Sequence, residues 1–312
     1  MFNCIRKFAC FCHGAGFTGS GETRLASEVW LAGLPDGRVE VLTAQTDMGQ
    51  GAQTVLAQIV ADRLALDLGQ VQVATPDTAR VPNSGPTVAS RTAMVVGSLL
   101  QQACDDLVAQ VNPEQGTTGK AVQDAIRVWH ATHPGQPLLG RAKYRQPPSI
   151  QWDEEHYRGD AYPCYAWATH VAEVEVDLRT YVTRVTDYVA AQEVGKVINP
   201  TLAAGQIRGG VAQGIGWALT EQVVLEDGAM SNNQLTDYII PTAADLPSIR
   251  VHFEEQPSPY GPRGAKGMGE LPMDGPAPAV INAVCDALDT SISAIPLTPE
   301  RLLEHLEGPA DG

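Results

Sequence analysis

Alternating apolar and polar positions predict a pair of strands in the middle of the chain. From Ala168 to Val176, apolar residues and one histidine recur at every second position, which places them on one face of a strand. Residues 177–180 are typical of a turn, and residues 181–189 of the strand that returns from it. His170 is then interpreted as a strand residue with a hydrogen-bond partner.

The first part of the chain alternates between strand and helix signals. Strand-like segments at 25–31 and 38–42 flank a Pro-Asp-Gly turn, and a short strand is expected at 71–74. Apolar residues between Val55 and Leu64 keep the three-and-four spacing of a helix. Two more helices are predicted, from the turn after residue 90 to residue 111 and over 122–129, and residues 133–163 are interpreted as a long connection.

Two further helices are predicted near the C-terminal half. The segment 202–219 keeps helical apolar spacing but is dense in glycine, and each glycine costs a helix about 1 kcal/mol against alanine. That cost suggests close packing against a ligand or another helix. The segment 278–288 is the second helix, with Asp274 or Gly275 as its cap and Pro276 in its first turn.

A loop rich in glycine and proline, residues 260–279, holds a single glutamate, Glu270, next to Gly269 and Leu271. This composition excludes a helix or a central strand. A carboxylate on a rigid loop beside apolar residues is placed like a general base, and burial there would raise its pKa towards the working pH. The alternative is a tight turn with a solvated glutamate.

Two glycine-containing turns predict an anion-binding geometry. Residues 49–51, Gly-Gln-Gly, end a strand and open a helix, which presents free N–H groups to an anion. Small residues at 87–90 also precede a helix. An ordinary strand-to-helix junction is the alternative for the first turn.

Gly14, Gly16 and Gly19 fit the G-x-G-x-x-G pattern of nicotinamide-dependent dehydrogenases. That fingerprint needs a helix directly after it. Ser20, Gly21 and the strand-like segment that follows do not supply one, so we discard this interpretation.

Composition narrows the class of protein. The net charge of -15 argues against a nucleic-acid partner, and no apolar run approaches the roughly 18 residues of a membrane span. The N-terminus lacks the pattern of a signal peptide. The six cysteines are scattered, with neither paired metal-ligand spacing nor ferredoxin spacing, and we expect free thiols in a cytoplasmic protein.

Five segments, in this order, resemble the C-terminal cofactor-binding half of the molybdenum hydroxylases, the xanthine dehydrogenase and aldehyde oxidase family. They are HGAGFTGSGE, QTDMGQG, PNSGPTVASRT, INPTLAAGQIRGGVAQGIGWALTE and GAKGMGE. The resemblance implies an α+β fold, with mixed sheets packed against helices. It makes residues 1–312 the second cofactor-binding region, with two possible subdomains, about 1–135 plus 250–312 and about 136–249.

The resemblance also implies chemistry and site residues. The cofactor is a molybdenum held by a pterin dithiolene, in its cytosine dinucleotide form, and the reaction is hydroxylation of an N-heterocycle or aldehyde carbon with water as oxygen source. Glu270 is implied to be the catalytic base. The residues implied to contact the cofactor are Gly49, Gln50, Gly51, Thr87, Val88, Ala89, Ser90, Gln206, Gly267 and Gly269. Phe17 and Thr18 are implied to pack beside the substrate.

The resemblance also implies partner subunits, because the family uses cofactors for which this sequence has no binding motif. We expect a larger molybdopterin-binding subunit, a [2Fe–2S] subunit and an FAD subunit, because this chain carries no iron–sulfur cysteines or flavin motif. The helix at 202–219 and the HGAGFTGSG loop are expected nearest the larger subunit. Alternatives are a scaffold or cofactor-insertion subunit, which would not need Glu270, and a member with carbon monoxide dehydrogenase or hydroxybenzoyl-CoA reductase chemistry.

Overall fold

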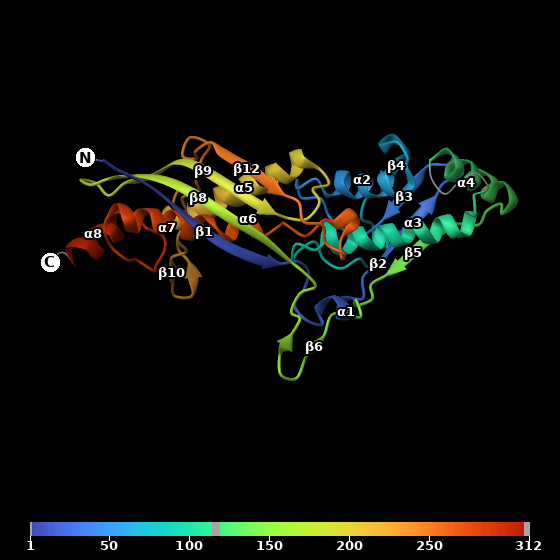
Figure 1. Ribbon diagram of the computed structural model, residues 1–312, viewed down its shortest axis with the longest axis horizontal. Coiled ribbons are helices and arrows are strands. Elements are labelled where there is room, and N and C mark those ends of the chain that lie inside the picture. The colour runs from blue at the N-terminus through green and yellow to red at the C-terminus, as the bar shows by residue number, and fades with distance from the viewer. Residues whose placement is uncertain (1, 114–118, 309–312) are drawn as a thin grey trace.

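The computed structural model describes residues 2–113 and 119–308 of this 312-residue chain, and the molecule is elongated (Figure 1). Two four-stranded sheets, each with its own helices, follow one another along the long axis. We call them the long-strand unit, which holds β1, β8, β9 and β12, and the short-strand unit, which holds β2, β3, β4 and β5.

The long-strand unit is built on strands in the order β1, β8, β9 and β12. β1 (Phe2–Gly14) pairs antiparallel with β8 (Tyr165–Asp177), which pairs antiparallel with β9 (Thr183–Glu193). β12 (Ile249–Glu254) runs parallel to β9. The predicted alternation is confirmed, because every second residue of β8 is buried.

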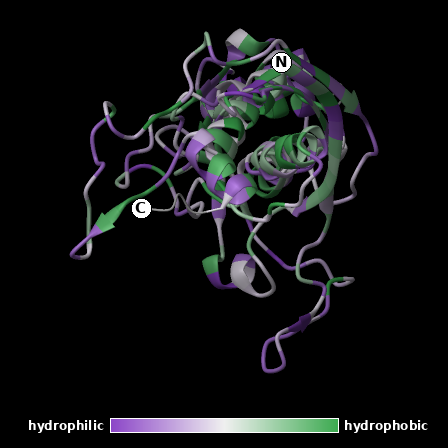
Figure 2. Ribbon diagram, turned by 90° about the vertical axis from the view of Figure 1, so that its left-hand side faces the viewer, coloured by the Kyte–Doolittle hydropathy of each residue, from purple (hydrophilic) through white to green (hydrophobic). Residues whose placement is uncertain are grey.

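Helices cover one face of this sheet. They are α5 (Pro200–Leu219), α6 (Leu271–Asp274), α7 (Pro276–Ala287) and α8 (Pro299–Glu307). Viewed along the long axis, the helices lie inside the curve of the strands (Figure 2). The two helices predicted at 202–219 and 278–288 are confirmed as α5 and α7, and Gly275 is the residue before α7.

The short-strand unit has the strand order β4 (Val71–Val73), β3 (Val39–Leu42), β2 (Glu28–Gly33) and β5 (Leu138–Lys143). β3 pairs parallel with β4, and the other pairs are antiparallel. The unit also contains α2 (Ala52–Leu64), α3 (Gly97–Val111) and α4 (Lys120–Thr132), with a π-helical turn, Thr92–Val96, before α3. The three helices predicted in this part of the chain are confirmed as α2, α3 and α4. In α2 the predicted apolar face is buried in the core of the unit, at Leu56, Ile59 and Leu64.

Two sequence interpretations are wrong. Residues 133–163 are more than a connection, because β5 pairs with β2 along its whole length. Residues 25–31 are not one strand, because the short helix α1 (Gly21–Leu25) ends in a left-handed residue, Ala26, before β2 begins. A helix does therefore follow the Gly14–Gly19 pattern, although it spans only one turn.

The packing within each unit can be compared with the expected subdomain boundaries, which stay a prediction. One core cluster of buried residues runs from Val29 to Ala142, and another from Ala172 to Leu302. α7 packs on β1 and β8. The C-terminal residues thus pack with the strands of the long-strand unit.

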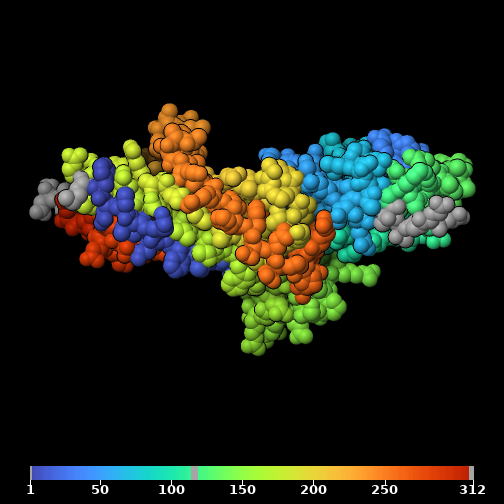
Figure 3. Space-filling model, turned by 45° about the horizontal axis from the view of Figure 1, so that its top comes forward, coloured from blue at the N-terminus to red at the C-terminus, as the bar shows by residue number. Residues whose placement is uncertain are grey.

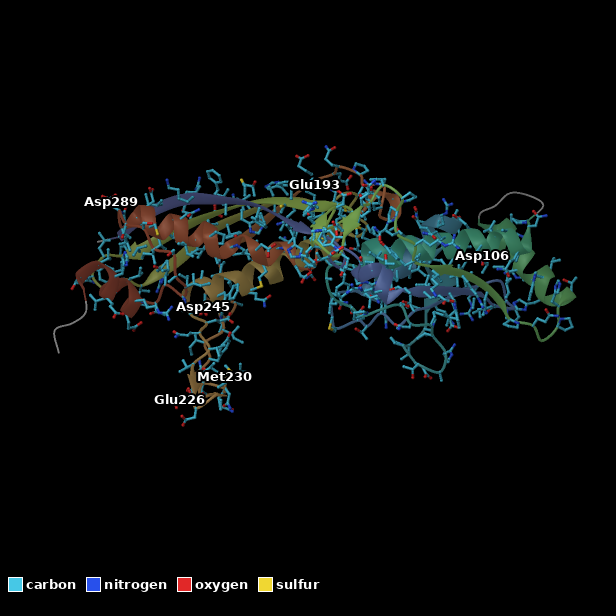
Figure 4. All side chains as sticks on the ribbon, turned by 90° about the horizontal axis from the view of Figure 1, so that it is seen from below. Asp106, Glu193, Glu226, Met230, Asp245 and Asp289 are labelled. Carbon is cyan, nitrogen blue, oxygen red and sulfur yellow. The ribbon has the colours of Figure 1, made fainter. Side chains whose placement is uncertain are left out.

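Two hairpins stand out from the body in the space-filling view (Figure 3). One joins β6 (Trp152–Asp153) to β7 (Arg158–Gly159), and the other joins β10 (Leu225–Glu226) to β11 (Ala229–Met230). Figure 4 labels Glu226 and Met230 at the tip of the second hairpin and Asp245 at its base. Within residues 2–113 and 119–308, no helix has the length and apolar character needed to cross a membrane.

Candidate active site

Glu270 lines two neighbouring cavities at the junction of the two units. We call the cavity of about 470 Å³ the inner cavity and the cavity of about 830 Å³ the outer cavity. Gln50, Leu202, Gln206, Gly269 and Glu270 line both. The inner cavity is completed by residues 87–93 of the short-strand unit and by residues 194 and 196–199 after β9. The outer cavity is completed mainly by further residues of α5 and by α6. The wall between the two cavities therefore carries the carboxylate.

Ser90 holds Glu270 by two reciprocal hydrogen bonds. The Ser90 hydroxyl donates to Glu270 Oε2 at 2.9 Å, and the Glu270 backbone N–H donates to Ser90 Oγ at 3.0 Å. His13 Nε2 lies 3.3 Å from the same Oε2. Among the described residues, no protein donor reaches the other oxygen, Oε1. One carboxylate oxygen is thus anchored and the other is available.

We expected Glu270 to be buried, and this expectation is wrong for the isolated chain. Its side chain is 53% exposed. The outer cavity is bordered by glycines of α5, Gly205 and Gly209, which have no side chain to cover the carboxylate. A base in this position stays open on one side unless another surface closes the outer cavity.

The turn at residues 87–90 has an unusual backbone. Ala89 and Ser90 both have positive φ angles, 54° and 50°, a conformation that costs non-glycine residues of order 1–3 kcal/mol. The Ala89 carbonyl accepts from the Gly16 N–H at 2.9 Å, which ties the turn to the loop after β1. Surrounding contacts therefore hold Ser90 under Glu270.

A buried ion pair, which the sequence analysis missed, fixes this turn. Arg91 has no exposed surface and binds Glu22 with two nearly parallel hydrogen bonds of 2.8 Å. Arg91 also donates to the Ser84 and Pro86 carbonyls and to the Ser27 hydroxyl. A charge-assisted fork of this kind specifies geometry as well as energy. No periodic signal marks such a pair, because its members are 69 residues apart.

Gly267 lets the glutamate loop approach the Ser90 turn. A Cβ at Gly267 would lie 1.8 Å from the Ser90 carbonyl oxygen, so only glycine fits. A Cβ at Gly269 would lie 3.4 Å from Ser90 Oγ, an ordinary contact. The two glycines of the motif are therefore not equivalent.

The turn at residues 49–51 departs from our expectation of free N–H groups. The Asp47 carboxylate accepts from the backbone N–H groups of Gly49, Gly51 and Gln53 at 2.9 to 3.2 Å. Burial raises the pKa of Asp47, but these three donors outweigh it and hold the pKa below its ordinary value. An aspartate of the chain thus occupies the position predicted for an external anion.

Other predicted residues serve mainly to join segments. Gln50 bonds within its own loop, donating to the Thr46 carbonyl at 3.0 Å. Thr87 Oγ1 accepts from the Thr46 N–H at 2.9 Å. Gln206 donates to the Gly269 carbonyl at 3.0 Å, which ties α5 to the glutamate loop. Val88 is half exposed on the inner cavity.

Phe17 and Thr18 are not brought together with the other predicted residues. Neither they nor Gly51 line the two cavities, on the part of the chain that the structure describes. Thr18 bonds to the Tyr162 hydroxyl at 2.6 Å, and the Phe17 N–H donates to Glu22. A substrate role for Phe17 and Thr18 stays a prediction.

The inner cavity fits an anionic, hydrogen-bonding group. Over the described residues, the backbone N–H groups of Ala89, Ser90, Gly267 and Gly269 donate to no protein acceptor. Lys196 and Lys266 line the same cavity, each already paired with a glutamate, Glu255 and Glu193 respectively. Backbone donors rather than unpaired cations are thus the means of holding an anion here.

The model of the molybdopterin cofactor-binding domain family matches residues 7–247. The chain belongs to this family. The resemblance described from the five segments is thereby confirmed, together with an α+β fold of mixed sheets packed with helices.

Curated relatives and solved structures agree with this family. The chain is 29% identical to the 6-hydroxypseudooxynicotine dehydrogenase complex subunit gamma of Paenarthrobacter nicotinovorans, covering 87% of this chain and 36% of that protein. It is 31% identical to a putative xanthine dehydrogenase molybdenum-binding subunit of Escherichia coli, covering 88% and 38%. The aldehyde oxidoreductase structure from Desulfovibrio desulfuricans superposes with a TM-score of 0.85 at 27% identity, covering 97% of this chain and 32% of that one. The chain therefore spans about a third of the length of these family members.

Proposed function

We propose that this chain carries the catalytic base of a molybdenum hydroxylase. This oxidoreductase would hydroxylate a carbon of an N-heterocycle of the purine or nicotinate type, or of an aldehyde, with water as the oxygen source. The observation that carries the proposal is Glu270, anchored by Ser90 on the wall shared by the two cavities. The names of the relatives, which include xanthine dehydrogenase and aldehyde oxidoreductase, support the substrate classes.

The residues divide the work between holding the cofactor and moving a proton. When bound, the molybdenum cofactor supplies the redox chemistry. The 87–90 turn, Gly267 and Gly269 would hold it through their backbone, and Gln206 through its side chain. Gly49 and Gln50 would border it at the outer cavity. Glu270 accepts a proton at its carboxylate.

The cytosine dinucleotide form of the cofactor is a narrower proposal, supported only by the resemblance to bacterial members of the family. We also propose a cytoplasmic location. Its support is that all six cysteines, including the exposed Cys4, Cys10 and Cys12, are free thiols.

We propose the partners from the need to cover the outer cavity and to carry electrons away from the site. A larger molybdopterin-binding polypeptide would cover the outer cavity, and [2Fe–2S] and FAD subunits would carry electrons away. A relative named as a complex subunit supports an assembly. The exposed stripe of α5 at Thr201, Gly205, Gly209, Gln213 and Trp217 borders the outer cavity and offers a surface for close approach.

The test uses the assembly co-purified with this chain, assayed against purines, nicotinate and aldehydes with a dye as electron acceptor. Glu270→Gln should retain molybdenum and lose turnover by about 100-fold to 10,000-fold, because the proton acceptor is gone. Glu226→Gln, on the tip of the projecting hairpin, is the matched control and should leave turnover unchanged. Full activity in Glu270→Gln at unchanged molybdenum content would show that Glu270 is not the base.

A further inference from the structure

His13 contacts the anchored oxygen of Glu270 and is itself held by a second carboxylate. Its Nδ1 lies 2.8 Å from Asp274 Oδ2, and its Nε2 lies 3.3 Å from Glu270 Oε2. Both ring nitrogens therefore face a carboxylate oxygen. The histidine comes from the end of β1, whereas Asp274 ends α6, so the tertiary fold creates the arrangement.

The surroundings favour the protonated ring. The hydrogen bond to Asp274 raises the pKa of His13 above its ordinary value of 6.5, partial burial opposes this, and the charges of Asp274 and Glu270 add to it. Among the residues that line the outer cavity, His13, Glu270 and Asp274 are the ionisable groups. An imidazolium can donate from both nitrogens at once, which is what two carboxylate partners require.

Nearby titratable groups do not compete for this proton. His170 on β8 is kept neutral, because burial lowers its pKa to about 4 although the charge of Asp274 acts in the opposite direction. Lys266 on the glutamate loop is paired with Glu193. The positive charge nearest to Glu270 is thus that of His13.

We propose that His13 is a positioning residue for the base: anchored on Asp274, it donates from Nε2 to Glu270 Oε2 and thereby leaves Oε1 to accept the proton. The inference rests on the proposed function for the identity of the reaction. The role of His13 and Asp274 in orienting Glu270 is inferred from the two contacts of the His13 ring.

The pH dependence follows from the charge of His13. Below its pKa the ring carries a proton on both nitrogens and can donate to Glu270 Oε2 while it stays bonded to Asp274. Above its pKa one of these two protons is lost. His13→Gln should therefore lower kcat roughly 10-fold at pH values below the pKa of His13, the size expected for losing a hydrogen bond to a charged group. Above that pKa the loss should vanish. KM should change little, because the proposed role of His13 is toward Glu270.

Asp274→Asn tests the second contact. Without this carboxylate the pKa of His13 falls, so His13 loses its charge at a lower pH and the profile approaches that of His13→Gln above that pH. His252→Gln, an exposed histidine of β12, is the matched control and should follow the unmodified protein. A loss of activity that is equal at every pH would show a purely structural role and overturn the proposal, as would an unchanged profile.

A second readout does not depend on turnover. Exchange of the ring C2 hydrogen for deuterium, followed by mass spectrometry of the co-purified assembly, reports the pKa of each histidine. We expect His13 to titrate above 6.5, and at lower pH in both Asp274→Asn and Glu270→Gln. A His13 titration that ignores both changes would overturn the proposal. If the assembly hydroxylates none of the substrates, the proposed function fails, and the exchange data still decide whether His13 is coupled to both carboxylates.

Discussion

At the scale of single residues, His170 shows which properties of a side chain the sequence pattern predicts and which it does not. Alternation on the strand predicted a histidine with a hydrogen-bond partner, and its Nδ1 lies 2.9 Å from the Tyr188 hydroxyl. Its full burial and its edge contact with Phe11 were not predictable, because they depend on residues from β1 and β9. Likewise, the loop composition singled out Glu270, but His13 and Asp274 are 261 residues apart and share no pattern.

The buried His170 predicts a loss of stability in acid. In the unfolded chain the ring binds a proton below about pH 6.5, but in the folded chain only below about pH 4, so the folded state weakens as pH falls through this window. The loss amounts to about 3 kcal/mol. Amide hydrogen exchange of β8 in the assembly should show it in the unmodified protein and not in His170→Gln. Equal pH dependence in both would contradict the assigned cause.

At the scale of elements, long periodic segments were predictable and short ones were not. α2, α5 and α7 bury apolar residues at helical spacing, which the sequence displays. α1 and α6 are too short to show a period, and β5 was hidden in a segment rich in proline, tyrosine and charge. The Asp47 cap was also missed, since nothing local shows whether a glycine turn keeps its N–H groups free.

The two glycines before Glu270 give a matched prediction for this loop. Gly267→Ala places a methyl group against the Ser90 carbonyl, so the loop must move away and the Ser90–Glu270 hydrogen bonds lengthen. We expect a destabilisation of about 1–3 kcal/mol and less molybdenum in the purified assembly. Gly269→Ala has room for its methyl group and should change both quantities little. Equal metal content in the two variants would mean that the tight contact does not shape the cofactor site.

At the scale of the whole molecule, the site lies where the two units meet. The segment from Tyr260 to Glu270 is bound to both: the Tyr260 carbonyl accepts from Ser98 of α3, and the Lys266 N–H donates to the Val194 carbonyl after β9. The order of motifs predicted the family, because ordered motifs are specific even when each is weak. It did not predict the two units, since the contacts that define them join distant residues.

Some glycines of α5 pack against other helices of this chain, and others face open space. The second group predicts the surface on which a partner assembles. A Cβ at Gly210 or Gly214 would meet Pro272 or Pro276, so these glycines let α6 and α7 pack closely. A Cβ at Gly205 or Gly209 would meet nothing within 4 Å, although each glycine weakens the helix by about 1 kcal/mol. A bare glycine surface beside Trp217, itself 50% exposed, is suited to a partner that approaches the backbone.

Gly209→Leu should therefore leave the fold intact, or stabilise α5 by up to about 1 kcal/mol, because leucine is the better helix former. The same side chain would stand between α5 and the larger molybdopterin-binding polypeptide that we propose as a partner. We expect co-purification of that polypeptide to fall sharply, and the molybdenum content to fall with it. Gly69→Leu, on a turn of the short-strand unit with equally open space, is the control and should assemble normally. If Gly209→Leu assembles as well as Gly69→Leu does, the partner does not contact this face of α5, and the outer cavity must be closed from another direction.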